Sequence, residues 1–483
     1  MIPDWTLSLS HLIFLSIIIH LWKSKSKLKV QIASFLVVSC CFWGLHWIFI
    51  SLNQYGGLNY LTASLATIIL ASYVASFYLI AGVIIRRLEL PSIGIAAVIC
   101  LAEWSKSNFL TGFPWLNTGV MQIDGPFSVF APFIGSFGVG FIAVYFAALI
   151  SHATKPSFIS AILICVTAFT FHSFNNFTEP SGKKLNIALI QGSISQKIKF
   201  DPIQEKISQI IHLDLIENAI QKNNKIDLIV LPETAFTKIF TNIEKEHLQK
   251  IKNQLTKNNS ILMMGIPRKN NNDWKNSLIA LEIAESSELK IYDNYDKHHL
   301  VPFGEFIPWG FKWFVNMMQI PLGDFKNGLN PQKPIKVKDQ HIGVNICFED
   351  LFGDEISSIF SESSFKEKPS ILLNISNLAW FGDTNALDYH LKASRMRSLE
   401  TGRPMLRATN TGITALIDHK GMVIKKLKPF ERNYLNVEVQ GTSGQTLYNY
   451  LGNYLILLFS LFVLFFLQKK NFLNLVKKKL DNT

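Results

Sequence analysis

Long apolar runs alternate with short polar segments along the first third of the chain. The apolar runs cover residues 6–22, 30–50, 59–85, 91–104, 126–150 and 157–171, with one more at 447–467. Most of them are long enough to cross a hydrocarbon layer about 30 Å thick as helices, although 91–104 and 157–171 are short. The pattern predicts a membrane domain over residues 1–171 with about six transmembrane helices, and a final transmembrane helix over 447–467.

The loops between these runs differ in their content of basic residues. Lys and Arg cluster at residues 23–29 and 86–87, around Lys155, and after residue 467. The loops at 51–58 and 105–125 hold a single lysine between them. Because basic loops favour the cytoplasmic side of a membrane, this alternation predicts that residues 172–446 lie outside the cytoplasm. Residues 468–483 are then expected to form a basic cytoplasmic tail.

From Lys183 the pattern changes to short β-prone runs that alternate with amphipathic stretches. Strands are predicted at residues 186–190, 227–231, 261–266, 277–283, 342–346, 370–375, 405–409, 413–418, 422–427 and 433–439. Asp201 and Pro202 are typical of a helix N-cap and a first helical residue. Strands that alternate with helices, mixed with hairpins, indicate a layered α/β domain with buried sheets over residues 183–440.

The chain has a formal net charge of +12, and hydrophobic residues make up 48% of it. In a soluble protein such a charge would suggest binding to nucleic acid. Here the basic residues lie at the ends of apolar runs, where they act as topology signals, so no nucleic-acid partner is expected. No stretch requires an oligomer, and a monomer is expected.

Only one cysteine lies in the polar part of the chain. The other four are Cys40, Cys41, Cys100 and Cys165, all inside apolar runs. Cys347 follows the apolar strand 342–346 at a predicted sharp turn, and Glu349 and Asp350 come directly after it. A sulfur at the end of a buried strand is held rigidly, and a helix that starts there favours the thiolate. Cys347 is therefore a candidate nucleophile, with a small buried hydrophobic residue as the alternative.

Two further stretches carry groups that could meet this sulfur. Glu233 is the first charged side chain beyond the apolar strand 227–231, where a partly desolvated carboxylate suits a general base. A helix-capping glutamate is the alternative. Lys297 offers a fixed positive charge that could stabilise a thiolate and a tetrahedral oxyanion, and Glu305 offers a second carboxylate. A surface lysine is the alternative for Lys297.

The neighbouring His298 and His299 could suggest a metal site. No third ligand with zinc-like spacing is evident, and adjacent side chains on an extended segment point in opposite directions. The sequence therefore predicts no metal site, and the chemistry of a thiol, an acid and an amine needs no dissociable cofactor.

These segments together resemble the Glu-Lys-Cys triad of the nitrilase, or carbon-nitrogen hydrolase, superfamily. The segments Leu231-Pro-Glu-Thr234, 295–305 and 346–350 carry the triad, and 377–382, 395–404 and 409–412 are similar to later blocks of that domain. With apolar runs on both sides and Thr111-Gly-Phe-Pro-Trp115 in an outer loop, the chain is most similar to the apolipoprotein N-acyltransferases of Gram-negative-type bacteria.

The resemblance implies an αββα sandwich in the periplasm, next to a multi-span α-helical domain in the inner membrane. Cys347 would take an acyl chain from a phospholipid as a thioester. The chain would then pass to the N-terminal amine of the diacylglyceryl-cysteine of an apolipoprotein, the final step of lipoprotein maturation. Glu233 would be the base, Lys297 would hold the oxyanion, and Glu305 would orient the triad. Thiolate attack followed by aminolysis is a chemically sound two-step route for these side chains.

The same resemblance implies that Phe348, Glu349, Phe200 and Trp380 contact substrate. The family commonly has Tyr where this chain has Phe348, and often Trp where it has Phe200. Both differences put the preference for an acyl chain or a head group in doubt, but not the reaction itself.

The segment Phe306–Leu322 is too apolar for an ordinary solvent loop. Trp309 and Trp313 suit a membrane interface and Met317 adapts to varied chains, so we expect a mobile arm that gates the entry of lipid. A buried connector is the alternative.

Two other functions compete with acyl transfer. A membrane-anchored nitrilase-type amidase would use water in place of the amine and act on a small amide, but a single anchor would suffice for it. A catalytically silent membrane scaffold would keep the sheets for binding alone. The complete set of Glu233, Lys297 and Cys347 argues against the scaffold.

Overall fold

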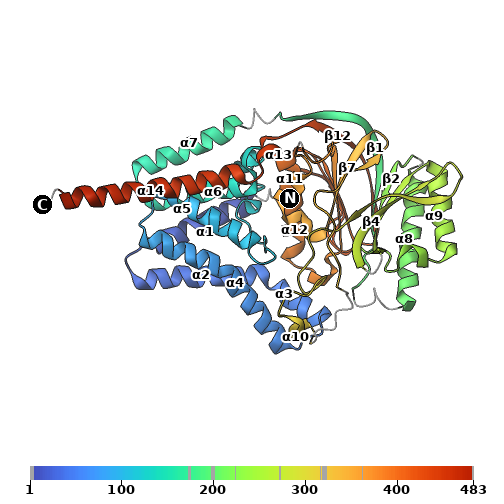
Figure 1. Cartoon of the computed structure of the whole chain (residues 1–483), viewed down its shortest axis with the longest axis horizontal. Coiled ribbons are helices and arrows are strands. Elements are labelled where there is room, and N and C mark those ends of the chain that lie inside the picture. Colours follow the sequence, from blue (N-terminus) through green and yellow to red (C-terminus); the bar gives the residue numbers. More distant parts are fainter. Residues whose placement is uncertain are drawn as a thin grey trace. The chain divides into compact units, whose positions relative to one another are not determined.

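The structure is a computed structural model that describes residues 5–171, 176–196, 202–223, 225–270, 273–315, 317, 324–361 and 363–480. The chain divides into two compact units (Figure 1). The first unit comprises Met1–Leu45, Thr67–Asn176 and Leu451–Thr483. The second comprises His46–Ala66 and Phe177–Tyr450, so a short segment between two apolar helices belongs with the sheets.

The first unit is helical. Its main helices are α1 (Trp5–Trp22), α2 (Lys27–Leu45), α4 (Tyr60–Arg87), α5 (Ser92–Asn108), α6 (Ala131–His152), α7 (Lys155–Phe171) and α14 (Tyr454–Leu480). Among the described residues, four segments are long and apolar enough to cross a membrane: Trp5–Trp22, Lys27–Leu45, Tyr60–Arg87 and Pro126–His152. Lys155–Phe171 and Tyr454–Lys469 are shorter apolar helices. Each predicted apolar run therefore lies mainly on a helix, while the number of membrane crossings and their orientation stay predictions.

One apolar run divides in a way that its hydrophobicity did not reveal. The run 30–50 was expected to be a single helix, but α2 ends at Leu45 and a short helix α3 (Trp47–Ile50) follows, with the π-helical turn η1 (Ser51–Tyr55) after it. The ring of Trp47 lies 4.3 Å from the ring of Phe381 in the second unit. The run breaks where the chain passes from the first unit into the second, and a hydrophobic pattern does not record such a boundary.

The second unit is built on two six-stranded sheets. The first has the order β12-β1-β2-β3-β4-β5 and the second β11-β10-β9-β8-β7-β6. The strands of the first sheet are β1 (Thr178–Gln191), β2 (Leu228–Val230), β3 (Ile261–Asn270), β4 (Asp273–Ile283), β5 (Leu289–Asp296) and β12 (Asn433–Gly444). Those of the second are β6 (Ile335–Val337), β7 (Gln340–Ile346), β8 (Ile371–Ser376), β9 (Met405–Thr409), β10 (Ala415–Ile417) and β11 (Val423–Lys426).

Each sheet is parallel at its centre and antiparallel at its edges. β1, β2 and β3 pair in parallel in the first sheet, as do β7, β8 and β9 in the second. Parallel strands are usually buried on both faces, and the central strands here are continuous apolar runs such as Leu228–Val230. The carboxyl ends of these strands therefore lie at one edge of each sheet, where the chain can present polar side chains.

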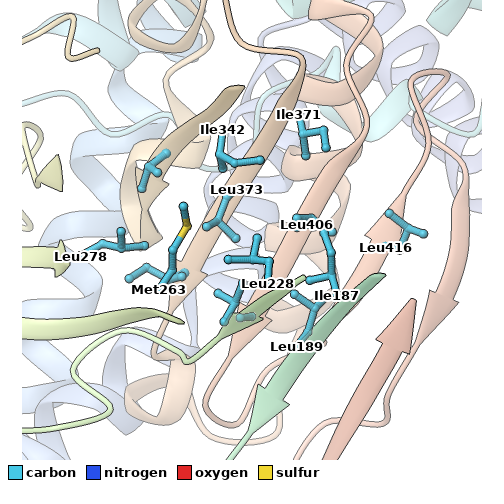
Figure 2. Packing of buried hydrophobic residues seen from close by; sticks show 14 of the residues in the cluster. Ile187, Leu189, Leu228, Met263, Leu278, Ile342, Ile371, Leu373, Leu406 and Leu416 are labelled. Atoms are coloured by element: carbon cyan, nitrogen blue, oxygen red, sulfur yellow. The ribbon is translucent and has the colours of Figure 1, made fainter. Parts of the chain in front are cut away.

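The two sheets pack face to face through a buried apolar layer (Figure 2). In the figure, Ile187, Leu228 and Met263 of the first sheet face Ile342 and Leu373 of the second. Helices α8 (Pro202–Lys222) and α9 (Lys245–Asn258) cover the other face of the first sheet through a second apolar cluster. Helices α11 (Gly353–Ser358) and α12 (Asn385–Thr401) cover the second sheet. The expected αββα sandwich is confirmed.

All of the predicted strands are present, and the structure adds two that were missed. β5 and β6 are edge strands, and β6 is only three residues long. β5 has the sequence LKIYDNYD. This sequence is too polar to show the alternation of apolar and polar residues by which a strand is recognised. This omission matters, because β5 leads directly to Lys297.

Candidate active site

Cys347 lies where β7 ends and a 3-10 helix, η6 (Cys347–Leu351), begins. Its backbone has a φ of +55°, in the left-handed region that non-glycine residues seldom adopt. The side chain is buried, with 9% of its surface exposed. The predicted sharp turn is therefore present, and it holds the sulfur at the carboxyl end of a central strand.

Lys297 lies just beyond β5, and its ammonium group is fully enclosed by protein. Its Nζ donates to Glu233 Oε1 at 3.3 Å and to Glu305 at 2.9 Å. The main-chain N–H of Lys297 donates to the carbonyl of Asn276 at 2.8 Å, which fixes the start of the loop to β4. Segments far apart in the sequence thus place one ammonium group between two carboxylates.

Asn276 on β4 completes this arrangement, and no pattern in the sequence singled it out. Its Nδ2 donates to Glu233 Oε1 at 2.7 Å and to Glu305 Oε1 at 2.6 Å. Glu305 Oε2 also accepts the N–H of Val301 at 2.7 Å. The only local signal was a polar residue at the start of an apolar strand, which does not reveal its partners.

The main chain after β8 connects Glu233 to Cys347. The N–H of Asn377 donates to Glu233 Oε2 at 2.8 Å and also forms a hydrogen bond with the side chain of Cys347. The side chain of Asn377 donates to Gln196 Oε1 at 2.8 Å and accepts from Asn410 at 2.9 Å. This network holds the carboxylate of Glu233 near the sulfur.

The charges around the sulfur act in opposite directions. Burial raises the pKa of Cys347 well above its ordinary value, the negative charge of Glu233 raises it further, and the positive charge of Lys297 opposes both. Burial alone lowers the pKa of Lys297, but Glu233 and Glu305 outweigh burial and raise it, so the ammonium stays charged. The resting sulfur is therefore a thiol. This differs from our expectation that a helix start would favour thiolate, because desolvation outweighs that effect here.

Glu349 is buried, and its described contacts are with the protein itself. Its Oε1 accepts the N–H groups of His298 and His299 at 2.6 and 3.1 Å, and its Oε2 accepts the N–H of Ile346 at 2.6 Å. Burial raises the pKa of Glu349 to about 7, although the hydrogen bond from Ile346 lowers it. These contacts join the loop that follows Lys297 to the end of β7. Contact with substrate, which we expected of Glu349, stays a prediction.

The other residues expected to touch substrate are placed differently. Phe348 is 7% exposed, and its ring lies 5.5 Å from the ring of His299. Trp380 is partly exposed, and its ring lies 6.0 Å from that of Tyr55. Phe200 lies outside the described residues. The roles of Phe348 and Trp380 in binding stay predictions.

A buried polar network next to Cys347 was not identified from the sequence. Arg407 on β9 and Asp350 on η6 form an ion pair at 3.1 Å, and neither side chain is exposed. Ser394 on α12 forms hydrogen bonds with both of these side chains. His390 on α12 lies 3.0 Å from Arg407 and 3.1 Å from the carbonyl oxygen of Cys347. Because these partners lie far apart in the sequence, no local pattern could have found them.

The two adjacent histidines make ordinary protein contacts. His298 Nδ1 lies 3.0 Å from the carbonyl oxygen of Gly328, and His299 Nδ1 lies 2.6 Å from Glu355 Oε1. Within the part of the chain that the structure describes, no group of three or more His, Cys, Asp or Glu side chains could hold a metal ion. The arrangement can instead support covalent acyl transfer, because it combines a thiol, a carboxylate and a fixed cation.

The apolar segment after Glu305 is largely exposed where the structure describes it, at residues 306–315 and 317. Trp309 is 98% exposed and Trp313 is 63% exposed. Phe314 and Val315, later on the same segment, are partly buried. They pack in an apolar cluster with Leu58, Ala63 and Phe303. Such exposure of large aromatic side chains argues against a buried connector and is typical of a surface that meets lipid or protein.

Comparison with known proteins identifies the family. A model of the apolipoprotein N-acyltransferase N-terminal domain matches residues 2–149, and a model of the carbon-nitrogen hydrolase domain matches residues 186–448. An apolipoprotein N-acyltransferase from Ralstonia nicotianae is 37% identical over 425 residues, which cover 85% of this chain and 79% of that protein. The chain belongs to the apolipoprotein N-acyltransferase family.

Other comparisons agree with this family. The apolipoprotein N-acyltransferase from Bordetella bronchiseptica is 32% identical over 493 residues, which cover 94% of this chain and 90% of that protein. Among solved structures, a carbon-nitrogen hydrolase from Helicobacter pylori matches 53% of this chain and 89% of its own, with 16% identity and a TM-score of 0.39. The family models and the apolipoprotein N-acyltransferase relatives confirm the resemblance found in the sequence, and these relatives do not favour a membrane-anchored amidase.

Proposed function

We propose that this chain transfers an acyl group from a phospholipid to the N-terminal amine of the diacylglyceryl-cysteine of apolipoproteins. The reaction is the final step of lipoprotein maturation. The observation that supports it most is the enclosed set of Lys297, Glu233 and Glu305 around the thiol of Cys347, in a chain that carries helices long enough to cross a membrane.

The first half-reaction forms a thioester on Cys347. Glu233 takes the thiol proton, and the sulfur attacks the carbonyl carbon of a phospholipid ester. Lys297 stabilises the oxyanion that develops on the carbonyl oxygen, since a fixed charge in a water-poor site needs no reorganisation. When the tetrahedral intermediate collapses, the C–O bond breaks and Glu233 returns the proton to the leaving alcohol. The products are a lysophospholipid and the acyl-enzyme.

The second half-reaction consumes the thioester. The free α-amine of the acceptor attacks the thioester carbonyl, and Glu233 removes a proton from the nitrogen. Lys297 again holds the oxyanion. The C–S bond then breaks, and the sulfur leaves and recovers a proton from Glu233. An amide is formed on the acceptor, and the resting thiol is restored.

Glu305 and Asn276 act through other residues. Both carboxylates share the Nδ2 group of Asn276, and Glu305 binds the ammonium of Lys297 at 2.9 Å. This arrangement fixes the direction of the ammonium and leaves Glu233 to handle protons. We therefore propose that Glu305 and Asn276 are positioning residues.

The family and the basic loops support a proposed location and proposed partners. We place the membrane unit in the bacterial inner membrane and the sheet-containing unit in the periplasm, where lipoprotein precursors present their amines. A monomer that uses neither a metal nor a dissociable cofactor is sufficient for this chemistry, and nucleic acid is not a partner.

The proposal is tested with purified protein in detergent micelles that contain acyl-labelled phosphatidylethanolamine and a synthetic diacylglyceryl-cysteine peptide. We expect N-acylated peptide and an equal amount of lysophospholipid. Cys347→Ser should abolish both products. Cys165→Ser is the matched control, because Cys165 is an exposed cysteine of α7 in the membrane unit, and it should leave both products unchanged.

Release of free fatty acid without N-acylated peptide would contradict the proposal, because it would mean that water is the acceptor. Conversion of a small amide, with no reaction of the lipid, would restore the amidase alternative. Binding of lipid without any product from the native chain would support the silent scaffold.

A further inference from the structure

The carbonyl group of Cys347 is held by two buried donors from different elements. His390 Nε2 on α12 lies 3.1 Å from this oxygen, and Asn374 Nδ2 on β8 donates to it at 3.3 Å. The φ of +55° at Cys347 is unfavourable for a non-glycine residue and persists only where the surroundings impose it. The two donors fix the peptide that follows the nucleophile, so they are suited to impose this conformation.

The position of Arg407 determines which nitrogen of His390 carries the proton. Arg407 Nη1 lies 3.0 Å from His390 Nδ1. A guanidinium group can only donate, so Nδ1 must accept and the ring hydrogen must be on Nε2. Nε2–H therefore points at the carbonyl of Cys347. Burial lowers the pKa of His390 well below its ordinary value, and Arg407 lowers it further, so the ring stays neutral.

Arg407 is itself anchored to the helix that begins at the nucleophile. Its Nη1 binds Asp350 Oδ2 at 3.1 Å, and Asp350 lies on the same short helix η6 as Cys347. His390 is 1% exposed, and Arg407 and Asp350 are completely buried. The contacts thus form a closed ring from Cys347 through Asp350, Arg407 and His390 back to Cys347. Solvent cannot replace any of these links.

We infer that His390 is a positioning residue for the nucleophile: its Nε2–H holds the carbonyl of Cys347 and thereby keeps the sulfur aimed at the substrate. This role rests on the proposed nucleophilic function of Cys347. His390 does not exchange protons with substrate. The charged groups near it are Arg407, Lys297 and Asp350, and the two cations both disfavour a charged imidazole.

The inference is tested by comparing two amides at the same position. In His390→Gln the side-chain amide can place an N–H close to the position of Nε2. In His390→Asn the same amide is one methylene shorter and cannot reach the carbonyl of Cys347. We expect His390→Gln to stay within several-fold of the native kcat. We expect His390→Asn to lose kcat on the order of 100-fold, because small misplacement of a reacting atom has effects of that size. The KM for phospholipid should be unchanged in both variants.

The pH dependence of kcat separates positioning from acid-base catalysis. Because the ring stays neutral, the profile of His390→Gln should have the same shape as that of the native protein. Asn374→Leu removes the other donor to the same carbonyl and should give the same loss of kcat at constant KM, so it supplies the test if His390→Asn does not fold. Thermal unfolding of each variant shows whether it is folded.

Three results would overturn the inference. The first is an equal loss of kcat in folded His390→Gln and His390→Asn. The second is a native kcat in His390→Asn or in folded Asn374→Leu. The third is the loss of one limb of the pH profile in His390→Gln. The variant Cys347→Ser distinguishes failure of this inference from failure of the proposed function. It abolishes acylation only if Cys347 is the nucleophile.

Discussion

Removal of the guanidinium group of Arg407 should destabilise the sheet-containing unit strongly. Arg407 and Asp350 form an ion pair at 3.1 Å in which neither side chain is exposed. Arg407→Met keeps most of the volume but leaves the carboxylate of Asp350 buried with Ser394 as its remaining described hydrogen-bond partner. Breaking a buried pair from one side costs about 3–5 kcal/mol, because the remaining charge stays desolvated.

The size of this effect should depend on pH. Burial raises the pKa of Asp350, and Arg407 opposes this increase. Without Arg407 the folded-state pKa rises further above the unfolded value, which is about 3.9. The folded state then binds a proton that the unfolded state has lost, so the free energy of unfolding of Arg407→Met decreases as pH rises from about 4 towards the raised folded-state value. The deficit relative to the native protein should therefore be smallest in acid and largest near neutral pH.

The assay is chemical unfolding in detergent over a range of pH, followed by near-UV circular dichroism. The double variant Asp350→Asn/Arg407→Met removes both charges and should recover most of the lost stability, as expected for a desolvated charge. Lys184→Met is the matched control. Its ion pair with Glu438 is shorter, at 2.7 Å, but both side chains are more than half exposed. Its loss should therefore change the free energy of unfolding by less than about 1 kcal/mol.

The reasoning would be refuted if Arg407→Met unfolded at the same denaturant concentration as the native protein. It would also be refuted by a deficit that does not change with pH, since that would mean the loss comes from packing rather than from an unpaired charge.

Three further predictions concern the site and the exposed segment that follows Glu305. Lys297→Met should slow the reaction of Cys347 with a small alkylating reagent and shift its pH dependence upward, because Lys297 opposes the rise in the thiol pKa; unchanged alkylation would contradict this. Asn276→Leu should lower kcat by about 10- to 100-fold in acylation assays, since both carboxylates lose a shared donor, and native kcat would exclude a positioning role. Trp309→Ala, which removes a 98% exposed ring, should weaken turnover of lipid in vesicles but leave alkylation intact, whereas equal loss of both would count against a lipid-facing arm.

Much of the fold could be predicted because its strands and helices have characteristic local sequence patterns. The central strands are continuous apolar runs, and Glu233 and Cys347 each follow the end of one of them. The stretch around Lys297 was selected for its charged side chains rather than for a strand pattern, since β5 is a polar edge strand. The sequence therefore singled out Cys347, Glu233 and Lys297, which the fold brings together, although the strand that leads to Lys297 was missed.

The parts that could not be predicted depend on pairing between distant residues. Asn276 is simply a polar residue in a strand until the fold brings Glu233 and Glu305 to it. His390 lies in a helix that is buried along nearly its whole length, so its sequence has no clear amphipathic face, and its partner Arg407 is on a strand of the second sheet. The sequence also suggested thiolate at Cys347, because local reasoning included the helix start but not the depth of burial.

The central claim is that the sulfur of Cys347 carries the acyl group between donor and acceptor. The most direct measurement is mass spectrometry of the peptide that contains Cys347, after incubation of the native protein with phosphatidylethanolamine and no acceptor. We predict an added acyl group that is removed by hydroxylamine, that disappears when a diacylglyceryl-cysteine peptide is added, and that is absent in Cys347→Ser. An unmodified Cys347 in a preparation that still transfers acyl groups to the peptide would contradict the account.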